Sequence, residues 1–409
     1  MEGSYFFSIF RTLASKGLYM KAIPYLLIIF FSLGCKQSKK ITDSDITIFT
    51  QEHIRVLKKA DLYLNLAPVT VTDAVCERSA GGKNDFYSEG DYWWPDPENP
   101  EGPYIRKDGM TNPENFTAHR EAMIRFSQVA GALGSAYLVT EDLKYAKALL
   151  PHLKAWFLNT ETMMNPNLLY GQAITGLVTG RGIGIIDTIH FMEVVKAIEA
   201  ISASGVIINS DLDGIKKWFS AYLTWITTHE YGIAERDNGN NHSVCWAMQA
   251  AVFASFVHNK EVLDYCKNMY KTVLLPLQMA ADGSFPLEIK RTKPYGYSLF
   301  NLDAMSTICQ VLSTPEENLF EYTVDAKNMK LGLSFLYPFV KDKSTWPYQK
   351  DVMHWDEWPV NHPSFLFGGL ALKNDAYLDL WQSLKSDFDT PEVIRNMPVR
   401  YPLLWISKF

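Results

Sequence analysis

The sequence predicts an all-α protein made of helical hairpins. Apolar residues recur at three- and four-residue intervals through much of the chain, which is the spacing of one face of an amphipathic helix. Strand signals are scarce, and loops rather than alternating strands join the helical segments, so successive helices are expected to pair. Several segments begin with a cap residue, as at Asp45 and Ser210. The segments with this spacing are 45–66, 118–138, 142–158, 188–202, 210–228, 242–256, 260–277, 297–311, 317–336 and 375–384.

Length and composition fit one large globular domain at residues 41–409. The chain has 409 residues, of which 47% are hydrophobic and 13% aromatic. Its formal net charge of -6 gives no general attraction for a polyanion, so local basic residues in a cleft would have to hold an acidic polymer. Nucleotide binding is not indicated, because the glycines around Arg181 lack the strand context of a dinucleotide motif and the lysine of a phosphate loop. Neither nucleotide nor nucleic acid is expected as a partner.

Residues 1–40 are predicted to be a leader and tether outside the fold. Met20-Lys21 begins a short cationic head, and residues 22–33 form an apolar run too short to span a bilayer as a helix. The following Gly34-Cys35 completes a segment that resembles a lipoprotein processing site. We therefore expect a start at Met20 and lipidation of Cys35, with an ordinary cleaved signal as the alternative. Both imply export, to the periplasm or outer membrane of a bacterium.

The other cysteines indicate neither a zinc site nor a disulfide scaffold. Cys76, Cys245, Cys266 and Cys309 fit no zinc-ligand spacing, and they are too few for a disulfide framework. The last three lie in apolar helical segments, where buried thiols are expected.

Two polar stretches carry the residues that point to chemistry. Residues 235–242 hold two carboxylates, three asparagines and a histidine, and an apolar run that suits a buried helix follows them directly. In residues 282–298, Arg291 precedes Tyr297 by six residues, and Tyr297 opens the next apolar segment. Together the two stretches supply Asn, His, Arg and Tyr.

This set of side chains matches β-elimination from a uronic acid. The base must remove the weakly acidic C5 proton, and the carboxylate beside that carbon opposes the developing carbanion unless it is neutralised. Asn241 and His242 are suited to hydrogen-bond the carboxylate, with Glu235 or Asn240 orienting them. The scheme needs neither a metal ion nor a cofactor.

A tyrosine is the expected proton-transfer residue. It can take the proton if a cation such as Arg291 lowers its ordinary pKa of about 10. In D-glucuronate and D-mannuronate, H5 and O4 lie on one face of the ring, so one tyrosine can serve as base and then as acid in a syn elimination. His242 as base with Tyr297 as acid would instead suit anti elimination from guluronate or galacturonate.

Five short motifs are similar to those of a known family. The motifs 91–97, 164–167, 179–182, 240–242 and 287–291 resemble the alginate-lyase superfamily of polysaccharide lyases, and most of all polysaccharide lyase family 38, which includes glucuronan lyases. The likeness runs from about Asp45 to the C-terminus.

The resemblance implies an (α/α) toroid, an incomplete α/α barrel whose long loops lie over a central cleft. It also implies that Asn241 and His242 address the carboxylate, that Tyr297 transfers the proton with support from Arg291, and that Glu235 belongs to the same site. Tyr295, two residues before Tyr297, is the competing tyrosine and otherwise a substrate contact.

Two loop regions supply candidate substrate contacts. The connection 67–116 is too long for a simple linker, and it carries Trp93 and Trp94 as a platform for sugar rings and Arg106 as a carboxylate ligand. The tryptophans could equally plug the loop into the core. Residues 164–184 add Asn167, Gln172 and Arg181, the last with a salt bridge to Asp187 as its structural alternative.

The sequence therefore predicts a lyase acting on a β-1,4-linked polyuronate, glucuronan first and mannuronate-rich alginate second. One rival is a toroidal glycoside hydrolase that pairs Glu235 with Glu288 or Asp187. Another is a surface glycan-binding protein that needs only the tryptophans and Arg106. In the structural alternative for the polar stretches, His242 belongs to a helix cap and Arg291 forms a surface bridge with Glu288.

Overall fold

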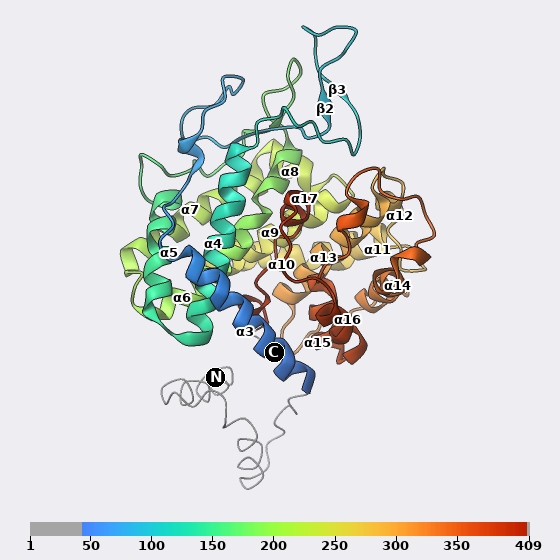
Figure 1. The fold of residues 1–409 in the computed structure, drawn as a ribbon. Helices are drawn as coiled ribbons and strands as arrows, with labels where there is room; N and C mark the ends of the chain where they lie inside the picture. The colour runs from blue at the N-terminus through green and yellow to red at the C-terminus, as the bar shows by residue number, and fades with distance from the viewer. Residues whose placement is uncertain (1–42, 407–409) are drawn as a thin grey trace.

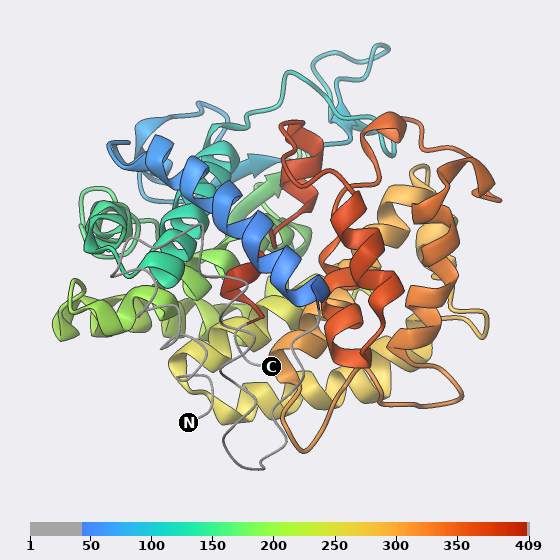
Figure 2. The same ribbon diagram turned by 60° about the horizontal axis from the view of Figure 1, so that its bottom comes forward.

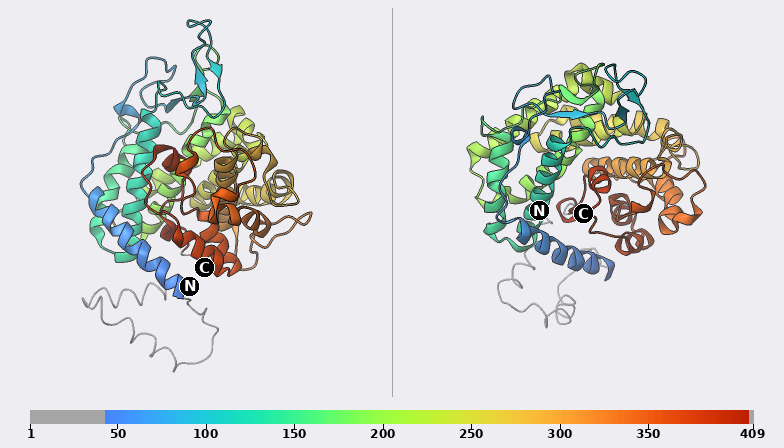
Figure 3. Two further views of the ribbon diagram at one scale, coloured as in Figure 1. Left: turned by 45° about the vertical axis from the view of Figure 1, so that its right-hand side comes forward. Right: turned by 45° about the horizontal axis from the view of Figure 1, so that its top comes forward.

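The helices form an open ring of hairpins, as expected. The structure is a computed structural model that describes residues 43–406, so the predicted leader and Cys35 lie outside the described residues. Figure 1 and the right-hand view of Figure 3 show the helices following one another around the ring. The helices are α3 (Asp43–Tyr63), α4 (Ala118–Thr140), α5 (Leu143–Phe157), α6 (Phe191–Ile201), α7 (Asn209–Thr228), α8 (Glu230–Arg236), α9 (Asn241–Val257), α10 (Lys260–Met269), α11 (Leu275–Gln278), α12 (Pro286–Ile289), α13 (Pro294–Leu312), α14 (Met329–Lys341), α15 (Pro363–Leu372), α16 (Asp375–Ser383) and α17 (Pro391–Asn396).

Pairwise packing between helices builds the ring. α4 packs on α3, α5 and α6, α9 packs on α7, α10 and α13, and α15 joins α13 to α16. Figure 2 shows α3 crossing one face of the ring beside the C-terminal segment, whose last 3₁₀ turn, Pro402–Leu404, contacts α3, α4 and α6. None of the helices within residues 43–406 is both long and apolar enough to cross a membrane.

Helix α9 is the central element. Asn240 caps its start, since the Asn240 Oδ1 accepts the backbone N–H of His242 at 2.9 Å. Nearly every residue from Ser243 to Phe256 is buried, which fits a helix that has neighbours on all sides. The cap fixes where the polar residues before it stand relative to the core.

One predicted helix begins later than expected and another is interrupted. Residues 317–336 were expected to be helical, but two tight turns, bridged at Thr314–Glu317 and Val324–Lys327, fill the space before α14. The α14 helix starts only after Asn328, whose Oδ1 accepts the backbone N–H of Leu331 at 2.9 Å and so caps it. The predicted helix 260–277 contains a π-helical segment, Tyr270–Leu274, before Pro276, which lacks a backbone donor.

The long connection 67–116 projects from one end of the ring and carries short strands. β1 (Tyr87–Glu89) pairs in parallel with β4 (Tyr170–Ala173), and β2 (Trp93–Trp94) pairs antiparallel with β3 (Ile105–Arg106). Figure 1 shows β2 and β3 standing above the helices.

Buried Asp91 ties this connection to the ring. Its carboxylate accepts from Arg120 Nη1 at 2.7 Å and from Arg395 Nη2, on α17, at 2.5 Å. Burial alone would raise the pKa of Asp91, but the two guanidinium groups lower it to about 2. The segment that follows, with Tyr92 and Trp93, is thereby held over the ring.

The predicted burial of three thiols is confirmed. Cys245, Cys266 and Cys309 are inaccessible, and burial raises the pKa of Cys266 and of Cys309 to about 12. Among the described residues, no group of three or more His, Cys, Asp and Glu side chains is placed to hold a metal ion.

Candidate active site

The fold brings the two polar stretches together. Asn241 and His242 stand at the start of α9, while Arg291 and Tyr297 flank the start of α13, and these two helices pack directly on each other. Burial raises the pKa of Glu288, on the short helix α12, and Arg291 and His242 both lie close enough to oppose that rise. Residues that are distant in the chain thus share one end of the α9–α13 pair.

A buried glutamate holds His242. Nδ1 of His242 lies 2.7 Å from Oε1 of Glu235, and the Glu235 side chain is fully buried whereas 15% of the His242 side chain is exposed. Because a carboxylate only accepts, Nδ1 carries a proton, and Nε2 remains to meet a ligand. Glu235 therefore fixes both the orientation and the tautomer of the imidazole.

Asn241 is held by the second buried carboxylate. Its backbone N–H donates to Glu288 Oε1 at 2.9 Å, and its Nδ2 donates to Glu288 Oε2 at 2.6 Å. Burial raises the pKa of Glu288, and the two hydrogen bonds from Asn241 oppose that rise. One amide hydrogen of Asn241 stays unused by Glu288, so the side chain can still donate to a ligand. Asn240, predicted as an orienting or substrate residue, acts here as the helix cap.

Two cationic side chains lie close to Tyr297. The Nη2 of Arg291 lies 3.2 Å from its Oη, and the Arg291 guanidinium lies 4.4 Å from the centre of its ring. The ammonium group of Lys293 lies 5.6 Å from the same centre. Asp108, in the long connection, pairs with Arg291 at 3.0 Å, so the alternative bridge from Arg291 to Glu288 does not form.

The pKa of Tyr297 differs from the expectation. Burial raises it well above its ordinary value, the neighbouring phenol of Tyr92 adds to the rise, and Lys293 and Arg291 oppose it. Burial therefore outweighs the two cations in setting the pKa of Tyr297. The cations still lower the cost of ionising it.

Tyr295 does not face the site, which corrects its assignment as a substrate contact. Its side chain is fully buried, and its Oη donates to the backbone oxygen of Phe339 at 3.1 Å. Its ring packs between Trp346 and Trp355, at centroid distances of 5.1 and 5.4 Å. Tyr295 is part of the packing under the C-terminal loop.

Sequence reasoning missed two residues that touch Tyr297. The Oη of Tyr92 lies 2.7 Å from the Oη of Tyr297. Lys293 is 4% exposed, lies over both phenol rings, and pairs with Glu392 of α17 at 2.7 Å. The only sequence signal was position in the chain, because Tyr92 stands beside the tryptophans and Lys293 between Arg291 and Tyr297. Position in the chain does not predict that either residue approaches the phenol.

Lys293→Met is expected to move the pH profile of kcat to higher pH by about one to two units, because a cation that favours the ionised phenol is lost. The other charged or titratable groups near Lys293 are Glu392, Asp91, Asp351, Tyr92 and Tyr297. Initial rates at saturating substrate across pH measure the effect. If the acid limb moves, Tyr297 acts as the base, and if only the alkaline limb moves, it acts as the acid.

The control for this experiment is Lys290→Met, which removes an exposed lysine from the same segment and should leave the profile in place. An unmoved profile in a folded Lys293→Met variant would show that the ammonium group does not act on the reacting phenol.

The other predicted substrate contacts lie in two places. Arg181 donates to Gln172, and its guanidinium lies 5.9 Å from the ring centre of Trp93. Trp94 donates through Nε1 to the Met110 backbone at 2.9 Å and has Lys107 over its ring. Both tryptophans are half-buried, so neither plugs the core fully.

Arg106 and Asn167 make local contacts. Arg106, on β3, is exposed and pairs with Asp108 at 2.6 Å, which links it to the partner of Arg291. Asn167 accepts the backbone N–H of Leu169 at 3.2 Å within a turn and contacts no other predicted site residue.

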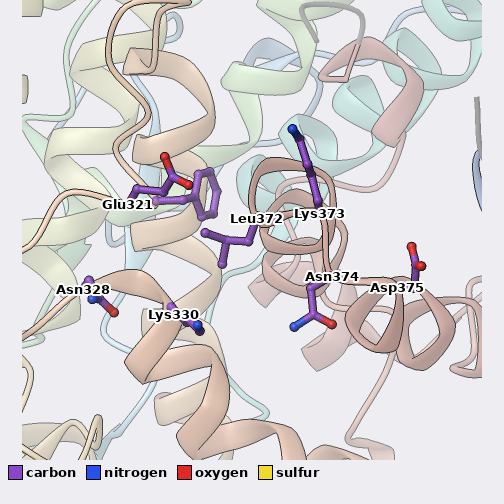
Figure 4. A pocket seen from close by; sticks show the side chains of 8 residues that line it. Glu321, Asn328, Lys330, Leu372, Lys373, Asn374 and Asp375 are labelled. Carbon is purple, nitrogen blue, oxygen red and sulfur yellow. The ribbon is translucent and has the colours of Figure 1, made fainter. Parts of the chain in front are cut away.

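The described residues also line a separate cavity, of about 460 Å³. Figure 4 shows it between the turn before α14 and the junction of α15 with α16. None of the candidate active-site residues lines it. Its lining consists of Phe320, Glu321, Asn328, Lys330, Leu372, Lys373, Asn374 and Asp375.

The carboxylates proposed for a hydrolase all pair with other side chains of the protein. Glu235 holds His242, and both oxygens of Glu288 accept from Asn241. Asp187 is buried and accepts from Ser88 at 2.6 Å, with Arg120 at 3.2 Å. No pair of these carboxylates faces an open cleft as retaining or inverting hydrolysis requires.

The described residues form a helical ring in which the Asn241–His242 pair and the Arg291–Tyr297 pair lie at the starts of two helices that pack on each other. A family model described as alginate lyase matches residues 70–346, and the chain belongs to this family. The chain is thus an enzyme of the lyase class, and neither the hydrolase nor the non-catalytic alternative is retained.

Solved structures agree with this assignment. An alginate lyase from Bacteroides ovatus is 30% identical, with a TM-score of 0.76 over 88% of this chain and 94% of that chain. Alginate lyase A1-III from Sphingomonas species A1 is 14% identical, with a TM-score of 0.52 over 86% of this chain and 95% of that one. A histidine-to-alanine variant of A1-III complexed with a tetrasaccharide is also 14% identical, with a TM-score of 0.58 over 88% and 94%, respectively. The A1-III structures show a shared fold only. A search of curated proteins finds no significant match.

Proposed function

We propose that this protein cleaves a β-1,4-linked polyuronate, glucuronan or mannuronate-rich alginate, by β-elimination. The observation that carries the proposal is that three hydrogen-bonded pairs of side chains lie at the same end of α9 and α13. The pairs are His242 with Glu235, Asn241 with Glu288, and Tyr297 with Arg291. The alginate-lyase family match and the similarity to the Bacteroides ovatus enzyme support it. Export through the N-terminal leader remains part of the proposal.

Asn241 and His242 are proposed to bind the carboxylate of the reacting sugar. As the C5 proton leaves, charge moves onto this carboxylate, and two donors that buried carboxylates already fix stabilise it without reorganising. The donors are the Asn241 amide and Nε2 of His242, which donates when the imidazole is protonated on both nitrogens. Glu235 accepts from Nδ1 of His242 at 2.7 Å, and Glu288 accepts from Nδ2 of Asn241 at 2.6 Å. Their contribution is therefore expected to be larger in the transition state than in the bound ground state.

In the syn route, Tyr297 transfers the proton. Its phenolate takes H5, the electron pair forms the C4–C5 double bond, the C4–O4 bond breaks, and the phenol gives the proton to the leaving oxygen. Arg291 and Lys293 stabilise the phenolate by charge, and Tyr92 can donate a hydrogen bond to it across the 2.7 Å contact. This route suits glucuronate and mannuronate.

A second route uses Tyr297 as the acid, a role that its raised pKa suits. Burial raises the pKa of Tyr297, and Glu235 leaves Nε2 of His242 free to accept a proton. His242 would then remove H5 while Tyr297 protonates O4 from the opposite face, which suits guluronate or galacturonate. The two routes predict different substrates.

A panel of polyuronates tests the proposal. Elimination creates a double bond conjugated to the carboxylate, so new ultraviolet absorbance is expected with polyglucuronate or polymannuronate. Absorbance with polyguluronate or polygalacturonate would support the second route. Chain shortening without new absorbance would mean hydrolysis, and no reaction with any of the four polymers would refute the proposed substrate class.

A further inference from the structure

Arg181 is a partly buried cation beside the candidate active site, and no carboxylate in the described part of the chain forms a salt bridge with it. Its Nε donates to the backbone oxygen of Gln172 at 3.0 Å and its Nη2 to Gln172 Oε1 at 3.1 Å. Asp187, the partner expected from the sequence, is taken by Arg120 and Ser88. Within residues 43–406, the other arginines that approach this end of the ring each have a carboxylate: Arg106 and Arg291 have Asp108, Arg120 has Asp91 and Asp187, and Arg395 has Asp91 and Glu392.

The position of this guanidinium is fixed by its surroundings. Gln172 is buried and has a φ of +52°, an unusual backbone conformation for a residue other than glycine. This conformation turns both oxygens of Gln172 toward Arg181. On either side of Arg181, a Cβ at Gly180 would lie 1.9 Å from the Leu169 oxygen and one at Gly182 2.5 Å from the Tyr231 oxygen. Only glycine fits there, so the chain is packed closely around Arg181.

The free donors of Arg181 suit a carboxylate. Of the five guanidinium N–H groups, Gln172 occupies two, and both hydrogens of Nη1 and one of Nη2 remain. These N–H groups form the outer end of the guanidinium, which can donate two parallel hydrogen bonds to one carboxylate. Burial lowers the pKa of Arg181, and nearby Arg106 lowers it further, whereas Asp91, Glu235 and Asp187 act on it only from a distance. An anionic ligand would satisfy this charge.

Arg181 lies at the active end of the ring but has its own set of contacts. The next residue, Gly182, packs against the backbone of Glu235, the residue that holds His242. A Cβ at Gly90 would lie 3.0 Å from Nη2 of Arg181, and Tyr92, two residues further on, contacts Tyr297. Arg181 and the Asn241–His242 pair have separate hydrogen-bond partners among the described residues: Gln172 for the arginine, and Glu288, Glu235 and Asn240 for the pair.

We propose that Arg181, positioned by Gln172 and Trp93, binds the carboxylate of the uronate next to the one that reacts. The enzyme then recognises two adjacent charged sugars rather than one. This inference rests on the proposed function and names a second subsite for it. Because Arg181 does not touch the reacting sugar, its removal should weaken binding much more than it slows the chemical step.

The test compares Arg181→Met and Arg181→Lys with wild type. On the polymer that gives the ultraviolet product, Arg181→Met is expected to raise KM by about 10- to 100-fold while kcat changes by less than about threefold. Arg181→Lys, which keeps the charge but not the fork, should fall between. The matched control is Arg125→Met on α4, which removes an arginine whose Nη1 donates to the backbone oxygen of Ala67 at 3.1 Å and which forms no salt bridge within the described residues. Its KM should be unchanged.

Two further measurements separate this inference from the proposed function. The ratio of the Arg181→Met KM to the wild-type KM should shrink on polymer whose carboxylates are partly reduced to alcohols, since neighbouring charges are then missing. An equal ratio on native and reduced polymer would overturn the inference. Calorimetric binding of intact polyuronate to both proteins in a Tyr297→Phe background tests Arg181 even if wild type proves to have no lyase activity, and equal affinities there would also overturn it.

Discussion

Tyr297→Phe is expected to lower kcat by about 10³-fold or more while the protein stays folded and still binds polymer. In the syn route the phenol is both base and acid, and in the anti route it is the acid, so both routes lose an essential proton-transfer group. The ring and its contacts with Arg291 and Lys293 remain possible in the variant, because they involve the ring face. Initial rates of ultraviolet absorbance measure kcat, and calorimetry measures binding.

Tyr295→Phe is the matched control, since it makes the same change two residues earlier. It removes one hydrogen bond to the Phe339 oxygen, which is expected to cost about 1 kcal/mol of unfolding free energy and to leave kcat near the wild-type value. If Tyr297→Phe kept its turnover and Tyr295→Phe lost it, the reacting tyrosine would have to be reassigned. That outcome would contradict the burial of Tyr295 in the fold.

The pairs that sequence reasoning could identify are close in the chain. Glu235 and His242 are seven residues apart, and Arg291 and Tyr297 are six apart, so one motif contains both members. The pairs that it missed are set by closure of the ring. Tyr92 and Tyr297 are 205 residues apart, and Asp91 and Arg395 are 304 apart. No local pattern shows that α17 and the long connection meet over α13.

Errors in the helix prediction have similar physical reasons. Helix α15 was not predicted because residues 363–369 are buried on every side, so they show no polar face and no amphipathic period. In residues 317–336 the apolar Leu319 and Phe320 are fully buried, but they anchor a turn rather than a helix. The spacing of apolar residues shows which side chains are buried. When a loop packs on the core, its buried residues can by chance have the three- and four-residue spacing of a helix.

The pKa of Tyr297 could not be read from the sequence either. Arg291 was expected to lower it, and the structure confirms that the arginine is adjacent. Burial has the larger effect and raises the pKa instead, and the phenol of Tyr92 adds to the rise. The sign of the pKa shift therefore depends on how deeply the fold buries Tyr297, which the cation in the motif does not reveal.

His242→Ala is expected to lower kcat at saturating substrate by about 10²- to 10³-fold, with a smaller change in KM. The donor meets the sugar carboxylate most strongly as charge develops, so its loss cannot be recovered by adding substrate. Glu235→Gln keeps a hydrogen-bonding side chain at Nδ1 without the charge, and an intermediate loss is expected. His258→Asn, at the left-handed cap that ends the same helix, is the control and should leave kcat unchanged.

The substrate dependence of this loss separates the two roles of His242. If the imidazole only neutralises the carboxylate, the loss should be similar for every polyuronate that the enzyme cleaves. If it is the base of the anti route, the loss should be much larger on polyguluronate than on polymannuronate. A normal saturated rate in a folded His242→Ala variant would remove His242 from both roles, and the pairing with Glu235 at 2.7 Å would then have to be structural.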